Sequence, residues 1–80
     1  MRELSKLLKE RREALGIPQK AFAADLGWLS GQYISNIERG LCPFPLESIK
    51  KASKILDLAP AKIRKAFIMD AANEIDGALE

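Results

Sequence analysis

The chain is 80 residues long, with 48% hydrophobic and 30% charged residues and a formal net charge of +2. This length fits one domain, which buries only about 60 to 65% of the surface that its unfolded chain exposes. The sequence has no histidine, one cysteine and no glycine-rich phosphate loop, so we expect a protein that is not an enzyme and binds no metal, cofactor or small-molecule ligand.

Charge is unevenly divided along the chain. Residues 1–65 carry all 13 Lys and Arg residues and seven acids, a net charge of +6, whereas residues 66–80 carry four acids and no base, a net charge of −4. A basic body favours a polyanionic partner, although two solvated surfaces without a partner would give the same distribution. No apolar run approaches the roughly 20 residues of a membrane span, and residues 1–10 are unlike a signal peptide. We therefore expect no membrane contact and a cytoplasmic location.

Apolar residues recur three and four positions apart through most of the chain, and this spacing predicts helices. The first helix is expected over residues 3–15 and is followed by Gly16 as a stop signal. The second is expected over residues 19–26, with Pro18 at its start and Gly27 at its end. Gly27, at the end of the second helix, admits the positive φ angle of a tight turn.

The second half of the chain continues the helical pattern. Ser30 is a good N-cap for a third helix over residues 30–38, because its hydroxyl can accept a hydrogen bond from a free amide of the first turn. Two prolines make residues 41–45 a loop. A fourth helix is expected over residues 46–56 and a fifth from Pro60 onward. The predicted fold class is therefore all-α, a compact five-helix bundle.

The segment from Gln19 to Glu38 carries the functional signal. It holds a short helix, a turn containing glycine, and a second helix whose buried face is only Ile34 and Ile37. The polar side chains on the rest of that helix can donate and accept hydrogen bonds, as the reading of base edges in a major groove requires. These polar residues are Gln32, Ser35 and Asn36.

Four segments carry a family resemblance: LKERREALGIPQ (8–19), FAADLG (22–27), YISNIERG (33–40) and LESIKKASKILDL (46–58). In these segments the sequence resembles the phage repressor and Cro family of helix-turn-helix regulators, the lambda-repressor-like or xenobiotic-response-element type. Their order and spacing are far more specific than a lone helix-turn-helix match. The resemblance implies a five-helix domain that binds double-stranded DNA and reads the major groove with its third helix.

The resemblance and the residue chemistry together suggest individual roles. Arg12 and Glu38 are implied to form a structural salt bridge. The residues expected to face the bases are Ser30, Gly31, Gln32, Ser35 and Asn36. The residues expected to contact phosphate are Gln19, Lys20, Tyr33 and Arg39. The alternatives are a capping or solvated role for Gln19 and a solvated surface for Gln32 and Asn36.

Two departures from the family pattern bear on these contacts. The turn has one residue more than usual, which we place among Trp28, Leu29 and Ser30 because the spacing from Ser30 to Ile34 is kept. Trp28 is expected to pack on the domain surface or at the edge of the core, with insertion against DNA as the alternative. Gly31 stands where relatives often present a long polar side chain, so we expect specificity to shift toward other residues of the third helix or toward DNA shape.

The acidic end sets the predicted domain division. Residues 1–68 are expected to form the helix-turn-helix domain, and residues 69–80 an acidic continuation of the fifth helix that is either a dimerisation segment or a frayed tail. A stripe of the fifth helix could bury against a second copy. Its members are Ile63, Phe67, Ala71 and Ile75. Such a homodimer would set two reading helices about 34 Å apart on a palindromic operator.

The resulting interpretation is a sequence-specific transcription regulator, a repressor, that binds double-stranded DNA. The alternative is a protein–protein interaction module on the same scaffold, such as an antitoxin or adaptor without DNA binding. Phage or plasmid repressors, controllers of restriction-modification operons and antitoxins all use such short chains, and physical reasoning does not choose among them. Cys42 is expected to be an inert thiol, with redox sensing as the alternative.

Overall fold

The expected helices are present, and the all-α fold class is confirmed. The computed structural model describes residues 2–79. Its helices are α1 (Arg2–Ala14), α2 (Gln19–Asp25), α3 (Gln32–Glu38), α4 (Ile49–Ile55) and α5 (Pro60–Leu79), and a short 3-10 turn, η1 (Leu46–Ser48), precedes α4. Within residues 2–79 there is no strand, and no helix is long and apolar enough to cross a membrane.

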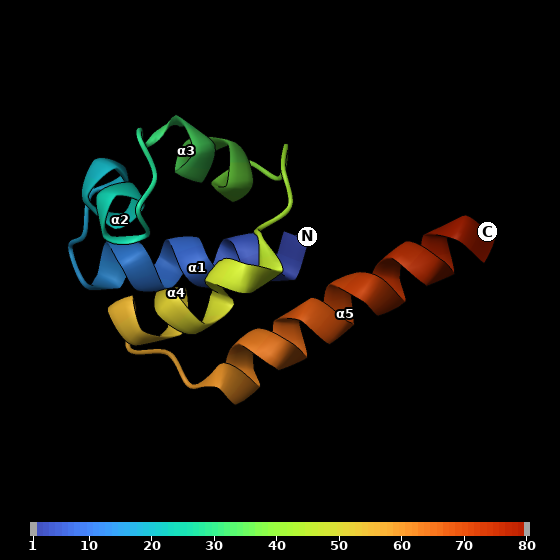
Figure 1. Cartoon of the computed structure of the whole chain (residues 1–80). Coiled ribbons are helices and arrows are strands. Elements are labelled where there is room, and N and C mark those ends of the chain that lie inside the picture. Colours follow the sequence, from blue (N-terminus) through green and yellow to red (C-terminus); the bar gives the residue numbers. More distant parts are fainter. Residues whose placement is uncertain (1, 80) are drawn as a thin grey trace.

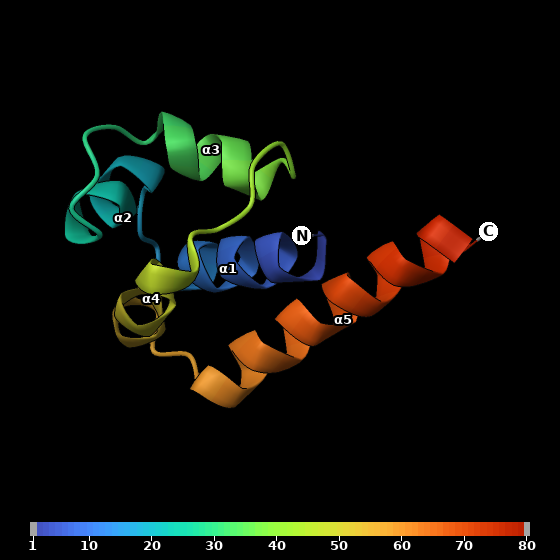
Figure 2. The ribbon, with the colours of Figure 1, turned by 45° about the vertical axis from the view of Figure 1, so that its right-hand side comes forward.

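The helices are arranged around α1. Figure 1 shows α2 and α3 on one side of α1, and α4 with the first turns of α5 on the other. In both views α5 runs past the N-terminal end of α1, and its C-terminal part extends beyond the other helices (Figures 1 and 2). The short helix-turn-helix unit and the long fifth helix therefore lie on opposite sides of the domain.

The hydrophobic core lies between these two sides. Its largest fully buried side chains are Leu4, Phe22, Ile34, Ile37, Leu56 and Ile63. Burying one such side chain stabilises a fold by about 1.5 to 3 kcal/mol relative to leaving it exposed. Two of these residues belong to α3, so the core itself holds that helix in place.

The first four helices end alike, with a left-handed residue and a hydrogen bond back across the last turn. At the end of α2, Gly27 has a φ of 82°, and the amide of Trp28 donates to the carbonyl of Ala23 at 2.8 Å. Gly16 has the same role after α1, so the stop signals predicted at both glycines are confirmed. At the end of α4 the left-handed residue is Asp57, with a φ of 50°.

The start of α3 differs from the prediction. The helix begins at Gln32 rather than Ser30, and Gly31 precedes it with a φ of −75°. The hydroxyl of Ser30 nevertheless accepts a hydrogen bond from the amide of Gln32 at 3.3 Å. Ile34 faces the core, as its spacing predicted.

Asp70 joins α5 to α1, although it lies beyond the predicted domain boundary at residue 68. The residue is 4% exposed, and its carboxylate accepts hydrogen bonds from the backbone amides of Glu3 at 2.6 Å and Leu4 at 3.0 Å. The first-turn amides of a helix have no partner within the helix, so Asp70 satisfies two of them. The N-terminal half of α5 is thereby attached to the body of the domain.

Candidate nucleic-acid interface

α3 has one buried face and one exposed face. Ile34 and Ile37 are each 2% exposed and anchor the helix in the core. Gln32 and Arg39 are exposed and Asn36 is half-buried. These three residues are spaced four and three apart, which places them on one face of the helix. α3 therefore presents polar side chains from a rigidly packed base.

The three polar residues form a hydrogen-bonded row. Nε2 of Gln32 donates to Oδ1 of Asn36 at 3.0 Å, and Nη2 of Arg39 donates to the same oxygen at 2.7 Å. Gln32 and Asn36 were predicted as base contacts and Arg39 as a phosphate contact, and the structure brings them together. The hydrogen bonds restrain long side chains that would otherwise be free to rotate.

Two predicted base contacts stand apart from this row. Ser35 is half-buried, and Ser30 is exposed in the turn, where its hydroxyl accepts the amide of Gln32. A base contact from either serine stays a prediction. The row of amide and guanidinium groups is the larger hydrogen-bonding surface on this side of α3.

Gly31 lies where the start of α3 approaches the start of α2. A Cβ at this position would lie 3.1 Å from the backbone N of Lys20 and 3.3 Å from the carbonyl carbon of Gln19. Backbone atoms cannot rotate aside as a flexible side chain can. Packing therefore explains the glycine, and only its backbone could contact a base.

The turn between α2 and α3 is held by aromatic packing. The rings of Trp28 and Tyr33 stack with centroids 4.8 Å apart, and the ring of Trp28 lies 5.7 Å from that of Phe44. Phe44 is 2% exposed, so the stack connects the turn to the core. The prediction that Trp28 packs at the edge of the core is confirmed. Leu29, by contrast, is fully exposed.

Arg12 on α1 and Glu38 at the end of α3 form a buried ion pair. Nε of Arg12 lies 2.6 Å from Oε2 of Glu38 and Nη2 lies 3.0 Å from Oε1, with the two side chains 10% and 4% exposed. Nη1 of Arg12 donates to the carbonyl of Ile17 at 2.7 Å. The hydrogen bond to Glu38 raises the pKa of Arg12, although burial acts in the opposite direction. The pair that the resemblance implies thus connects α1 to α3.

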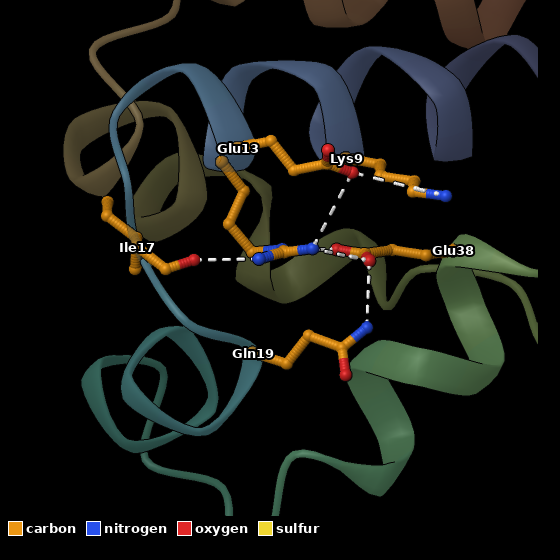
Figure 3. Close-up of polar contacts among 6 residues, drawn as sticks. Lys9, Glu13, Ile17, Gln19 and Glu38 are labelled. Carbon is orange, nitrogen blue, oxygen red and sulfur yellow. Dashed lines mark hydrogen bonds and ion pairs between the residues drawn. The ribbon is translucent and has the colours of Figure 1, made fainter.

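Gln19 belongs to the same network. Figure 3 shows its side chain directed at Glu38, and its Nε2 donates to Oε1 of Glu38 at 3.0 Å. Because Gln19 is the first residue of α2, the carboxylate of Glu38 links three helices. A phosphate contact from Gln19 stays a prediction, and it would use the backbone amide or the second hydrogen of the side-chain amide.

The other predicted phosphate contacts flank α3. Lys20 is exposed at the start of α2, beside Gly31, and Arg39 is exposed at the C-terminal end of α3. Tyr33 is 40% exposed, and its hydroxyl donates to the carbonyl of Pro43 at 3.5 Å. Positive groups on both sides of a polar helix suit the phosphates that border a groove. Their contact with phosphate stays a prediction.

The residues predicted for dimerisation do not share one exposed surface. Ile63 is 1% exposed and packs in the core of its own chain, so its assignment to a dimer surface is wrong. Phe67 and Ala71 are half-buried. Sequence reasoning placed the stripe on the face that α5 uses against its own domain. The exposed large apolar residues of α5, within the side chains described, are Ile68, Met69 and Ile75.

Residues 8–63 match the model of a helix-turn-helix family. The fold is similar to the high-resolution crystal structure of the restriction-modification controller protein C.AhdI from Aeromonas hydrophila, with a TM-score of 0.68 and 29% sequence identity. That similarity covers 78% of this chain and 92% of the other. No curated protein matches the sequence.

Proposed function

Because the chain belongs to the Cro/C1-type helix-turn-helix family, we propose that it represses transcription by binding a specific sequence of double-stranded DNA with α3 in the major groove. The family and the similarity to a restriction-modification controller indicate a DNA-binding transcription regulator rather than an enzyme. The observation that carries the finer proposal is the hydrogen-bonded row of Gln32, Asn36 and Arg39 on the exposed face of α3.

A major groove about 12 Å wide admits one α-helix, and its base edges present donors and acceptors. α3 meets the corresponding requirements, because its buried isoleucines fix its position and its exposed face carries amide groups. Ser30, Ser35 and the backbone of Gly31 are additional base contacts in this proposal. Lys20 and Arg39 would contact phosphates and set the orientation of the helix.

We further propose that the protein binds a palindromic operator as a homodimer. The support is the exposed apolar side chains of Ile68, Met69 and Ile75 on α5, a helix whose C-terminal part extends beyond the other helices (Figure 2). Burial of these side chains between two copies would remove apolar surface from water. Sedimentation at micromolar concentration should show a dimer, and Ile68→Glu should shift it to monomer. Wild-type protein that sediments only as monomer would contradict the dimer.

The test of DNA binding is a selection of random duplexes by the full chain. Gln32→Ala and Asn36→Ala should each weaken the base preference at particular positions while leaving the melting temperature nearly unchanged, because neither side chain belongs to the buried face of α3. Asn73→Ala is the matched control, since it removes an exposed amide from α5 rather than from α3. It should leave the selected sequence as it is.

The salt dependence of binding provides a second measurement. Each neutralised phosphate steepens the log–log dependence of the binding constant on salt by about 0.9. Lys20→Ala should therefore reduce the slope without changing the selected sequence. A folded protein that binds no duplex would contradict the proposed function and favour an interaction module on the same scaffold.

A further inference from the structure

Arg39 determines which way the side-chain amide of Asn36 points. A guanidinium has five N–H donors and no acceptor, so the Asn36 atom that lies 2.7 Å from Nη2 of Arg39 must be the oxygen. The amide nitrogen of Asn36 is then on the opposite branch of the side chain. The orientation follows from the chemistry of the arginine, independently of how the amide atoms are assigned.

The same oxygen fixes the orientation of Gln32. Oδ1 of Asn36 accepts from Nε2 of Gln32 at 3.0 Å as well as from Arg39, so both of its lone pairs are used. Among the side chains that the structure describes, Nδ2 of Asn36 and Oε1 of Gln32 have no hydrogen-bond partner. The row therefore offers a ligand the donor group of Asn36 and the acceptor of Gln32.

We propose that, in this arrangement, Asn36 contacts a base only as a hydrogen-bond donor and therefore selects guanine. Arg39 is its positioning residue. The inference rests on the proposed function, because it requires α3 to lie in the major groove. Guanine presents two adjacent acceptors there, N7 and O6, and the N–H groups of Asn36 can donate to both. The free oxygen of Gln32 then accepts from an amino group of a neighbouring base.

Adenine is disfavoured for a specific reason. The usual contact of asparagine with adenine uses both ends of the amide, with the oxygen accepting from N6 and the nitrogen donating to N7. In this protein the oxygen already accepts from Gln32 and from a charged guanidinium, and hydrogen bonds to charged groups are the stronger kind. Adenine recognition must break one of these bonds, whereas guanine recognition breaks none.

The test begins with the base pair that depends on Asn36. Duplex selection with wild-type protein and with Asn36→Ala identifies the position whose preference is lost, and wild type should require guanine there. In Arg39→Ala, the preference for guanine over adenine at this position should fall about tenfold. Arg39→Lys should retain it, because an ammonium group also donates to the oxygen. If Arg39 served only as a phosphate contact, Arg39→Ala would lower the affinity for both bases equally.

Base analogues test the same contact with the wild-type protein. Replacing the guanine by 7-deazaguanine removes the N7 acceptor and should weaken binding by about threefold or more. Replacing it by inosine removes only an amino group in the minor groove and is the matched control, with unchanged binding expected. Adenine selected at the Asn36-dependent position, no such position, or an unchanged base ratio in Arg39→Ala would each overturn the inference while leaving DNA binding intact. Absence of any duplex binding would instead refute the proposed function on which it rests.

Discussion

The guanidinium of Arg11 donates a hydrogen bond from Nε to the main-chain carbonyl of Leu56, at 2.7 Å. Leu56 is the C-cap of α4, where carbonyl groups lack partners within the helix and the helix dipole favours a cation. The next residue of α1, Arg12, binds Glu38 at the end of α3. Two adjacent arginines of α1 therefore hold the C-terminal ends of two other helices, one on each side of the domain.

Arg12→Ala should lower the free energy of unfolding by about 3 to 5 kcal/mol, because it leaves the carboxylate of Glu38 buried without its cation. The raised pKa of Arg12 means that the stability it contributes is lost only as the pH rises through that raised value. The loss should therefore be the same throughout the neutral range. Urea denaturation of both proteins at several pH values measures it. A loss below about 1 kcal/mol would show that the pair contributes little.

Asp57 offers a test of backbone strain, because it is a non-glycine residue with a φ of 50°. Asp57→Gly and Asp57→Ala both remove the exposed carboxylate that lies 3.7 Å from Arg11, so their difference isolates the backbone. Asp57→Gly should be more stable than Asp57→Ala by about 1 kcal/mol, since only glycine adopts this conformation without strain. Equal melting temperatures for the two variants would contradict this account.

Gly31→Ala should destabilise the protein by about 1 to 3 kcal/mol, because the added Cβ would press on the backbone of Lys20. The backbone conformation of Gly31, with a φ of −75°, suits alanine well. In open space the substitution would therefore raise stability by about 0.4 to 1 kcal/mol. The sign of the change in the free energy of unfolding, measured by chemical denaturation, decides whether α2 and α3 approach each other as closely as the structure shows.

Asp70→Asn should lower the free energy of unfolding by about 1 to 2 kcal/mol. The neutral amide keeps only one acceptor oxygen for the two amides that now donate to the carboxylate, at Glu3 and Leu4. Asp25→Asn is the control, because Asp25 is exposed and should change stability by less than about 0.5 kcal/mol. Hydrogen exchange should also be faster at the amide of Leu4. Unchanged exchange there would contradict the capping role.

Ser5→Ala should leave stability equal or raise it by up to about 1 kcal/mol. Ser5 is 3% exposed, and its hydroxyl has no hydrogen-bond partner within the described residues. Removing an unsatisfied buried hydroxyl lowers a desolvation cost, and alanine is also the better helix former. Ser35→Ala on α3 is the comparison, because that residue is only half-buried and reports mainly the helix preference. A loss of more than about 1 kcal/mol at Ser5 would indicate a hidden partner for the hydroxyl.

Local sequence signals predicted the helices and the helix-turn-helix segment. Apolar spacing, prolines before helices and glycines after them act over a few residues, so α2 was expected between Pro18 and Gly27 and was found there. The burial of Ile34 and Ile37 also followed from spacing alone. The spacing of apolar residues was enough to separate the core face of α3 from its polar face.

Contacts between distant segments were decided by the tertiary structure. The helical period places Ile63 on the same stripe as Ile75, but only the packing of α5 on its own domain shows that the first is buried and the second exposed. The cap that Asp70 provides for α1 joins residues more than sixty positions apart, and no local pattern signals it.

The hydrogen bond from Arg11 to Leu56 shows the same division. The sequence by itself determined that α1 carries adjacent arginines and that the next helices end where they do, because charge, helix period and stop signals are local properties. Only the fold decided which carbonyl Arg11 would reach, how the amide of Asn36 would point and how closely residue 31 would approach the backbone of Lys20. Each of these depends on the distance between groups on separate helices or turns, and that distance is set by how the helices pack around one core.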